Sequence, residues 1–335
     1  MKKYLLIMTV SLTALVSCND DETGTIVQNQ EFKLVTSSNT TGKVSFTDYL
    51  ATTPTVKSFT IASLDSDGVY LDSTTDEITV ASRTNNKLEV YSGIAAAVTN
   101  NLATLTSSIS SSASDFNNPR EIAVVGDKVV VTQDQNVANG NTNKLLVYQK
   151  TTTGFTLLNT YTVNFKTWGI FADGTTLYAV ADLTGDLVVF NNFFANVNGS
   201  ITPSKRVTIA GLVRTHGIVF SSTDDRMILT DVGSATVDSD GGIIVINNFS
   251  STLTATPNLG TIAATSQVRI SGTLSKLGNP VDVAYDNVSK RIYVAERLNA
   301  GGQVLVFAQP TVNGDATPIE ARIEAGVSSV FLLRK

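Results

Sequence analysis

The chain has 335 residues and a mass of 35.5 kDa; 42% of the residues are hydrophobic and only 16% are charged. So few charged residues disfavour a helical bundle, whose outer faces need Glu, Lys and Arg. The 24 basic and 29 acidic residues give a net charge of −5, and no basic block occurs, which argues against a nucleic-acid partner. The abundant Ser, Thr, Val, Asn and Gly instead favour strands joined by turns.

The first segment of the chain predicts a secretion signal. Lys2 and Lys3 precede an apolar run over residues 4–16, and the small residue Ser17 stands before Cys18. A short basic segment, an apolar stretch and a small residue at the break form a secretory signal peptide, here residues 1–17. The apolar run is shorter than the roughly 20 residues that a membrane-spanning helix needs.

The residues at this break, Leu15-Val16-Ser17-Cys18, resemble the lipobox of bacterial lipoproteins. The resemblance implies that the signal peptide is removed before Cys18 and that lipid is attached to this cysteine, which anchors the protein to a membrane. The alternative is a free thiol beside an ordinary cleavage site. Because Cys18 is the only cysteine, the domain that follows it forms no internal disulfide.

Residues 18–30 are expected to form a flexible acidic tether, because they contain few apolar side chains. The cluster Asn19-Asp20-Asp21-Glu22 directly follows the cysteine. It resembles the export signal of surface lipoproteins in the Bacteroidota, which implies an outer-membrane lipoprotein, either periplasmic or on the cell surface. The alternative is a solvated linker that only holds the domain away from the membrane, and the two roles are compatible.

Short apolar strands bounded by Gly, Asn or Asp recur along residues 31–335 and form an internal repeat. Four units of three predicted strands begin at residues 119, 167, 215 and 280, and the first three starts are 48 residues apart. A fifth unit spans residues 66–91. A more variable fourth strand, such as residues 155–163, leads from one unit to the next. Repeats of this length with four strands each are typical of β-propeller blades.

The two ends of the repeat region complete each other. Residues 32–46 contain a second and a third strand but no first strand, whereas residues 327–332 contain only a first strand. We therefore predict an all-β fold over residues 31–335: a six-bladed β-propeller of four-stranded blades, with the ring closed by the C-terminal strand joining the N-terminal blade. Such closure leaves no free sheet edge between the chain ends.

Two phrases of the repeat, Pro119-Arg120-Glu121-Ile122-Ala123-Val124 and Ile292-Tyr293-Val294-Ala295-Glu296, resemble the NHL repeat. Gly169 and Gly217 match the glycine of that repeat, whereas Glu121 and Asp282 replace it. The resemblance covers about residues 31–335. It supports the architecture rather than an activity, because propellers carry many unrelated functions.

One rim of the ring is expected to carry the binding site. First strands run beside the central channel, so their starts and the loops after the second strands should meet at the same rim. Equivalent positions there hold the single Trp, the single His, acids and arginines, and converging polar groups at a concave mouth indicate a binding site. The predicted binding residues are Asp67, Arg120, Glu121, Trp168, His216, Asp282 and Arg297.

Each of these residues also has a structural alternative. Trp168 either stacks on a ligand or fills the channel, and His216 either binds a ligand or makes a structural hydrogen bond. The arginines either face a ligand or pair with nearby acids. The acids that end second strands are expected to accept backbone hydrogen bonds in the following turn. These acids are Asp182, Asp231 and Glu296.

Catalytic motifs are otherwise missing from the sequence. A single His and no cysteine beyond Cys18 exclude the usual zinc sites, and neither a phosphate-binding loop nor a G-x-S-x-G motif occurs. Residues 238–242, DSDGG, resemble the start of a calcium loop, but Phe249 stands where its last glutamate belongs, so we interpret the segment as a hairpin turn. We predict no cofactor, with calcium or another divalent metal as the alternative.

Two functions are consistent with these features. The first is a non-enzymatic lipoprotein of the cell envelope that binds a protein or glycan through the loop-rich rim. The second is a hydrolase that resembles the six-bladed gluconolactonases and arylesterases, which hold a divalent metal in the channel. Asp67, Glu121 and Asp282 would supply carboxylates for that metal. Stoichiometric metal in the purified protein would favour the hydrolase.

Overall fold

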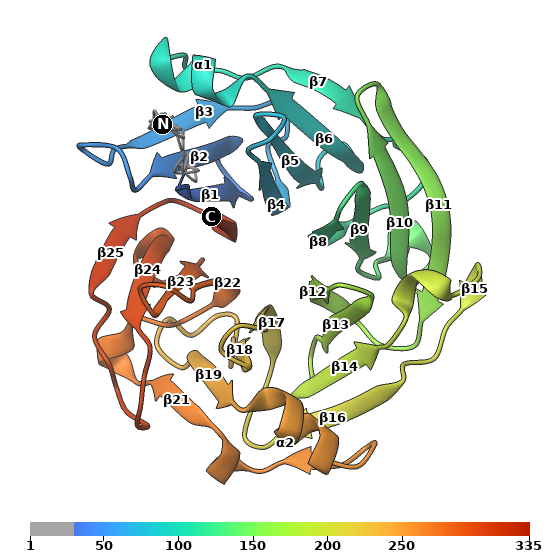
Figure 1. The fold of residues 1–335 in the computed structure, drawn as a ribbon, viewed down its shortest axis with the longest axis vertical. Coiled ribbons are helices and arrows are strands. Elements are labelled where there is room, and N and C mark those ends of the chain that lie inside the picture. Colours follow the sequence, from blue (N-terminus) through green and yellow to red (C-terminus); the bar gives the residue numbers. More distant parts are fainter. Residues whose placement is uncertain (1–29) are drawn as a thin grey trace, which may run out of the picture. The chain divides into compact units, whose positions relative to one another are not determined.

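The computed structural model describes residues 30–335, which form six small sheets arranged around a central channel (Figure 1). Residues 31–335 make up one compact unit. The predicted signal peptide, Cys18 and residues 19–29 of the predicted tether lie outside the described residues. Within residues 30–335, no helix is long and apolar enough to cross a membrane.

Each sheet is one blade, and its first strand lies beside the channel (Figure 1). The first strands, in ring order, are β26 (Val327–Arg334), β4 (Ser66–Asp72), β8 (Pro119–Val125), β12 (Thr167–Asp173), β17 (Thr215–Ser221) and β22 (Pro280–Asp286). The second strands are β1 (Phe32–Ser38), β5 (Glu77–Ser82), β9 (Lys128–Gln133), β13 (Thr176–Ala181), β18 (Arg226–Asp231) and β23 (Arg291–Glu296). The third strands are β2 (Lys43–Asp48), β6 (Lys87–Ser92), β10 (Asn143–Thr151), β14 (Asp186–Phe190), β19 (Gly242–Asn247) and β24 (Gln303–Ala308). The fourth strands are β3 (Val56–Thr60), β7 (Ser107–Ser110), β11 (Gly154–Val163), β16 (Lys205–Ile209), β21 (Val268–Ser271) and β25 (Glu320–Ile323).

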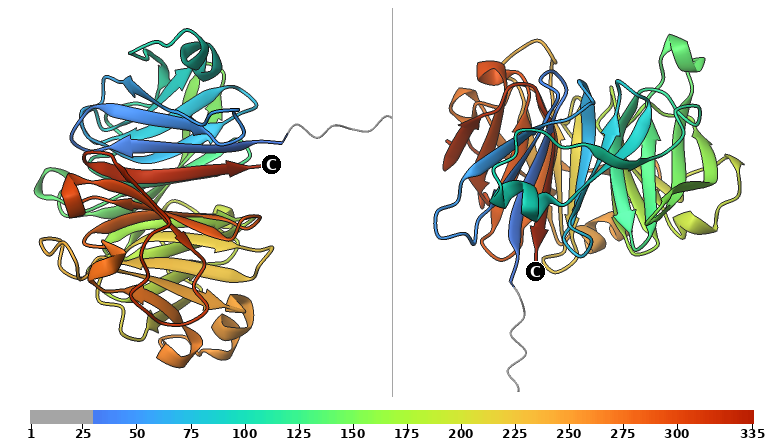
Figure 2. Two further views of the ribbon diagram at one scale, coloured as in Figure 1. Left: turned by 90° about the vertical axis from the view of Figure 1, so that its left-hand side faces the viewer. Right: turned by 90° about the horizontal axis from the view of Figure 1, so that it is seen from above.

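The six-bladed propeller and its ring closure are confirmed. β26 pairs antiparallel with β1, so that Phe32 lies opposite Arg334 and Ser37 opposite Ser329. Each first strand contacts the first strands of both neighbouring blades, from β26 through β4 and round to β22. Figure 2 shows β26 beside β1 and the C-terminus at the end of the ring where β1 begins.

Two blades contain a fifth strand that the repeat does not predict. β15 (Gly199–Ser200) adds parallel to β11, and β20 (Thr261–Ile262) adds parallel to β16. Each comes from the link between the third and fourth strands of the next blade, and each covers the outer edge of the blade before it. The α-helices of residues 30–335 also lie in links between third and fourth strands, α1 (Ile94–Thr99) between β6 and β7 and α2 (Phe249–Ala255) between β19 and β21. One-turn 3₁₀ helices, η1 (Val137–Asn139), η2 (Phe193–Ala195), η3 (Ala264–Ser266), η4 (Thr273–Ser275) and η5 (Asn299–Gly301), lie in loops.

The hydrophobic core lies in the wedges between neighbouring blades. Both faces of a blade are covered by its neighbours, so successive residues of a strand, such as Ile243 and Ile244, are both buried. In the wedge between β13 and β18, Tyr178 packs against Phe220 and Phe249, with ring centroids 5.4 and 5.7 Å apart. β-branched and aromatic side chains suit this pleated, fully covered surface, which explains why the strands read as continuous apolar runs.

Candidate functional site

The pairing of first and second strands shifts register near the start of the first strand in all six blades of residues 30–335, including β26, where the shift lies opposite the step from Ser37 to Ser38. The shift falls between Ser66 and Val69 in β4, between Pro119 and Ile122 in β8, and at the matching points of β12, β17 and β22. A β-bulge of this kind re-aims side chains that regular alternation would send to opposite faces. Two successive residues of each first strand, such as Arg120 and Glu121, therefore form two neighbouring layers along the channel.

The first layer contains Arg120, Trp168 and His216, which come from three successive blades and stack on one another. The rings of Trp168 and His216 are parallel to within 2°, and their centroids are 3.6 Å apart. The Arg120 guanidinium lies over the Trp168 ring, 4.0 Å from its centroid, in cation–π geometry. These three side chains thus meet as their equivalent repeat positions predict. We call them, together with Asp67 and Arg297, the rim cluster.

Arginines surround Asp67 in the rim cluster. Its Oδ2 accepts a hydrogen bond of 3.2 Å from Arg120, its Oδ1 accepts one of 3.1 Å from Arg297, and Arg83 Nε lies 3.7 Å from Oδ2. Arg120 also donates to Asp134 at 3.0 Å. Because these partly buried charges already pair with one another, they are satisfied without a ligand.

His216 is held by Asp182, the acid at the end of β13. Its Nε2 lies 3.0 Å from Asp182 Oδ1, and Arg214 donates to the same oxygen at 2.7 Å. Burial lowers the pKa of His216 to about 4, so the ring is neutral at pH 7. Although burial opposes ionisation of Asp182, the hydrogen bonds from His216 and Arg214 hold the pKa of this carboxyl well below its usual value.

The rim cluster therefore has the geometry of a closed plug. Trp168 is 7% exposed and His216 is 2% exposed, so little of either ring can meet a ligand. Arg120 and Arg297 have paired with nearby acids, which was one of the two alternatives for the arginines. A binding role for the rim cluster stays a prediction, and its contacts favour the channel-filling alternative for Trp168.

The acids that end second strands accept backbone hydrogen bonds, as predicted. Glu296 accepts from the backbone N–H groups of Asn279, Leu298 and Asn299 at 2.8–2.9 Å. Asp231 accepts hydrogen bonds from the N–H groups of Val213 and Arg214, before β17, and of Gly233, after β18. Asp182 accepts a hydrogen bond from the N–H group of the next residue, Leu183. These carboxylates hold loops in place at the rim.

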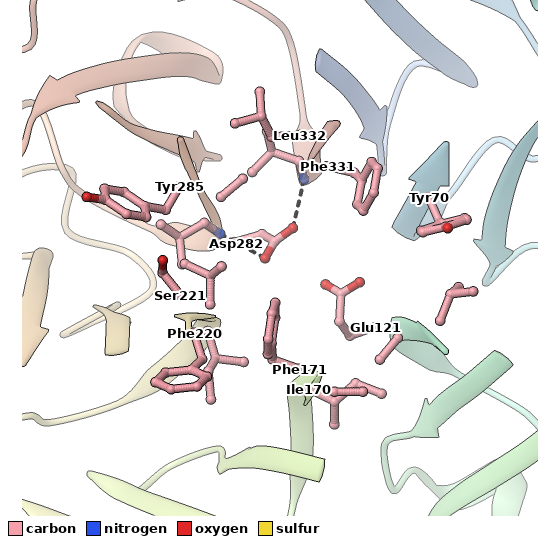
Figure 3. Close-up of a pocket in the computed structure, with 18 of the residues that line it drawn as sticks. Tyr70, Glu121, Ile170, Phe171, Phe220, Ser221, Asp282, Tyr285, Phe331 and Leu332 are labelled. Atoms are coloured by element: carbon pink, nitrogen blue, oxygen red, sulfur yellow. Dashed lines mark hydrogen bonds between the residues drawn. The ribbon is translucent and has the colours of Figure 1, made fainter. Parts of the chain in front are cut away.

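The second layer contains Glu121 and Asp282, whose carboxyl groups point toward each other across the channel (Figure 3). Glycines from neighbouring blades make room for them. A Cβ at Gly68 would lie 2.6 Å from Glu121 Oε1, and one at Gly217 would lie 2.8 Å from Asp282 Cα. Any larger side chain at Gly68 or Gly217 would therefore displace one of the two acids.

The two carboxyl groups differ in their partners. Asp282 Oδ2 accepts hydrogen bonds from Ser329 Oγ and Val330 N–H, both at 2.7 Å, and its Oδ1 accepts from its neighbour Val283 N–H at 2.8 Å. Glu121 Oε1 accepts only from Ile122 N–H, at 2.9 Å, and nothing among residues 30–335 donates to its Oε2. Burial raises the pKa of Asp282 to about 6. Burial, reinforced by the carboxylate of Asp282, raises the pKa of Glu121 well above its usual value.

Glu121 and Asp282 lie at a cavity of about 410 Å³ formed by all six first strands. It reaches the surface beside the exposed residues Ser222 and Thr223, at the ends of the first strands, whereas the rim cluster lies at their starts. Glu121 and Asp282, which the sequence groups with the rim cluster, lie in the next layer along the channel and line a cavity that opens at the other end. The bulges cause this difference, because they shift the third residue of each first strand into its own layer.

Aromatic side chains that the sequence-based prediction does not include form part of the cavity wall. They include Tyr70, Phe171 and Phe331 (Figure 3). Tyr70 and Phe331 pack together with ring centroids 4.7 Å apart. Their sequence signal is faint, since each is simply a half-buried residue late in a first strand.

The donor set does not fit a divalent metal. Asp67, which the sequence grouped with Glu121 and Asp282 as a candidate ligand, is held by arginines in the rim cluster. Among residues 30–335, no three His, Cys, Asp or Glu side chains lie where they could hold a metal ion. In the DSDGG segment, Asp240 accepts from Ser234 N–H at 3.0 Å within the loop between β18 and β19.

Solved structures with the same fold bear several different names. The chain is similar to a chain of a nidogen–laminin complex, with 12% identity and a TM-score of 0.61, covering 90% of this chain and 98% of that one. It is similar to a protein of unknown function from Bacteroides caccae, with 7% identity and a TM-score of 0.60, covering 91% and 100%. It is also similar to a periplasmic gluconolactonase of Pseudomonas aeruginosa, with 11% identity and a TM-score of 0.59, covering 90% and 99%.

At these identities the likeness shows the fold alone. No model of a protein family matches the sequence, and a search of curated proteins finds no match. The function is therefore inferred from the residues of the channel.

Proposed function

We propose that this chain is a non-enzymatic binding protein, anchored to the bacterial envelope at Cys18, that takes its ligand into the channel cavity. The observation that supports the proposal is the cavity itself. It has a volume of about 410 Å³, aromatic walls, two carboxyl groups and no basic side chain among its lining residues. Concave, largely apolar sites of this size with few polar groups are typical of ligand binding. The rim cluster, whose charged groups pair with one another although His216 Nδ1 and Arg297 Nε have no partner among residues 30–335, supports a structural role better.

The size of the cavity limits the ligand. About 410 Å³ accommodates a small molecule, or the terminal group of a protein or glycan that inserts into the mouth. The cavity would admit a smaller range of ligands than the loop-rich rim would, because a folded surface or an internal stretch of glycan needs a groove.

A screen of small molecules by ligand-observed NMR tests the binding function, with the unlipidated Cys18→Ala protein as receptor. Phe171→Ala removes one aromatic wall and should weaken cavity ligands about tenfold. Phe194→Ala, at a half-buried aromatic residue outside the cavity, is the matched control and should change nothing. A screen without any ligand that responds to Phe171→Ala would contradict the proposal.

The lipid anchor has its own test. In cells fed a labelled fatty acid, the wild-type protein should take up label and fractionate with membranes, because several acyl chains anchor a protein stably. Cys18→Ala should abolish both. Undiminished label on the variant would refute lipidation at Cys18.

Hydrolysis is a second candidate function, favoured by one structural neighbour named as a gluconolactonase and by the pair of buried carboxyl groups. A carboxyl that keeps its proton near neutral pH can act as a general acid while its partner acts as a base. If this candidate holds, the protein should hydrolyse D-glucono-1,5-lactone in a pH-stat faster than buffer does, and Glu121→Gln should lose that rate. A rate equal to the buffer rate excludes it for this substrate.

A further inference from the structure

Glu121 is the one buried acid of the channel that offers a free oxygen to the cavity. The residue is 8% exposed, and its Oε2 receives no hydrogen bond from residues 30–335. A carboxylate that is removed from water and not matched by a donor is costly, so its site gains most from a ligand that donates to it. Asp282, whose two oxygens accept three hydrogen bonds, is already satisfied.

No cation of the protein competes for this oxygen inside the cavity. Among the lining residues that the structure describes, Glu121 and Asp282 are the only acids, and there is no Lys, Arg or His. The nearest arginine in sequence, Arg120, is engaged with Asp67 and Asp134 in the rim cluster. The cavity is therefore acidic. Burial raises the pKa of Glu121, and a bound cation would favour the charged form of this carboxyl, so a positive charge is the best match for the site.

The aromatic walls add a second attraction for a positive charge. Figure 3 shows the ring of Phe171 beside the gap between the two carboxyl groups, with Phe331 and Tyr70 on the other side of the channel. The faces of aromatic rings carry partial negative charge and attract ammonium groups, most strongly where water is excluded. The same rings offer an apolar surface to the rest of a ligand.

We propose that the cavity selects a small organic cation: a protonated amine on an apolar body. Its N–H groups donate to Glu121 Oε2, and its apolar body packs against Phe171, Phe331 and Tyr70. This inference rests on the proposed binding function and names the ligand class. An inorganic divalent ion would need more free oxygens than Glu121 supplies, and an anion would meet two acids and no base.

The experiment compares probes that differ only in charge. Binding of 2-phenylethylamine and cyclohexylamine is measured by titration calorimetry at about pH 8, beside their neutral counterparts 2-phenylethanol and cyclohexanol. A charge-assisted hydrogen bond should make each amine bind about tenfold or more tightly than its alcohol. 3-Phenylpropionate, an anion of similar shape, should not bind.

Two matched variants locate the effect. Glu121→Gln keeps the side-chain shape and the acceptor for Ile122 N–H but removes the charge, so the preference of amine over alcohol should disappear. Asp173→Asn removes an equal charge from the exposed end of β12, outside the cavity lining, and should keep the preference. The melting temperature of each variant is recorded in parallel, so that loss of binding is not confused with unfolding.

Each other outcome overturns the inference in a distinguishable way. Equal binding of amines and alcohols that Phe171→Ala weakens would reject the cation and keep the binding function. Wild-type protein that binds none of the amines would reject the cation, and if the NMR screen also gives no cavity ligand, the binding function fails with it. Saturable calcium binding that Glu121→Gln abolishes would replace the amine with a metal ion.

Discussion

The two ends of the channel use similar residues for opposite purposes. At the starts of the first strands, Asp67 pairs with arginines and His216 pairs with Asp182. At the other end, Glu121 and Asp282 face a cavity without any base. Buried charges that pair with one another leave no group available to a ligand. A buried carboxyl oxygen without a donor can still accept a hydrogen bond from a ligand. The hydrogen-bond and ion-pair partners of these residues, rather than their types, therefore distinguish the plug from the candidate site.

Deleting residues 326–335 should have the largest effect on stability, because it removes β26, which forms part of the channel wall at both ends. β26 pairs with β1 along seven residue positions and contributes Ser329 to Asp282 and Phe331 to the cavity. The open ring should lose its cooperative unfolding transition, as followed by circular dichroism during heating. Deleting residues 19–30 is the control and should hardly change the melting temperature. A truncated protein as stable as the parent would refute the ring closure.

Trp168→Ala tests whether the rim cluster is a plug. The ring fills space between Arg120 and His216 and is 7% exposed, so its loss should lower the free energy of unfolding by about 3–5 kcal/mol. Urea denaturation measures this change. Leu183→Ala, at a side chain 62% exposed near the same rim, should stay within about 0.5 kcal/mol. A stable Trp168→Ala protein that no longer binds ligand would instead make the rim the site.

Acid should weaken the rim cluster through His216. The unfolded chain takes up a proton near pH 6.5, whereas the buried imidazole does so only near pH 4. Between these values the unfolded state binds more protons, so stability that is complete above pH 6.5 is lost as the pH falls. His216→Phe keeps a flat ring against Trp168 without titrating, and should remove about 2 kcal/mol of this pH dependence in urea denaturation between pH 7 and pH 4.5. Asp182, Arg214 and Arg297 surround the imidazole but keep their charges over this range, so an unchanged pH dependence in His216→Phe would contradict the lowered pKa of His216.

The carboxyl pair should respond to pH with the opposite sign. Glu121 and Asp282 hold their protons to higher pH in the folded protein than in the unfolded chain, so they reduce stability as the pH rises through their raised pKa values. Glu121→Gln should therefore raise the free energy of unfolding at pH 7.5 by about 1 kcal/mol, and the gain should vanish near pH 4. Asp173→Asn is the control, expected within about 0.5 kcal/mol. A Glu121→Gln protein less stable than wild type at pH 7.5 would contradict an unpaired Glu121.

The sequence was enough to predict the blades, the ring closure and the meeting of Arg120, Trp168 and His216. A repeat maps each residue onto the same place in every blade, so equivalent positions in neighbouring units must lie side by side. Some backbone partners of these acids, such as Leu298 for Glu296 and Gly233 for Asp231, could be predicted because they lie in the following turn. The other partners, such as Asn279 for Glu296, come from the loop before the first strand.

The division of the channel into two ends could not be predicted in this way. It depends on bulges that interrupt the two-residue alternation, and on the space above Gly68 and Gly217, which belongs to neighbouring blades. The repeat marks those positions as glycine or acid without showing which residue faces which. The added strands β15 and β20 arise from links whose sequence has no period, and they were missed for that reason.

The joining of β1 and β26 also decides where the chain enters the ring. Glu31 exchanges backbone hydrogen bonds with Lys335, and Phe331 and Leu332 of the same strand line the cavity, so entry point and cavity mouth share one face. With lipid on Cys18, the 13 peptide steps to Glu31 could span at most about 45 Å when fully extended. The cavity mouth, which lies on the same face as this entry point, would then stay within reach of the membrane. A ligand would then enter the cavity from the solution close to the lipid headgroups.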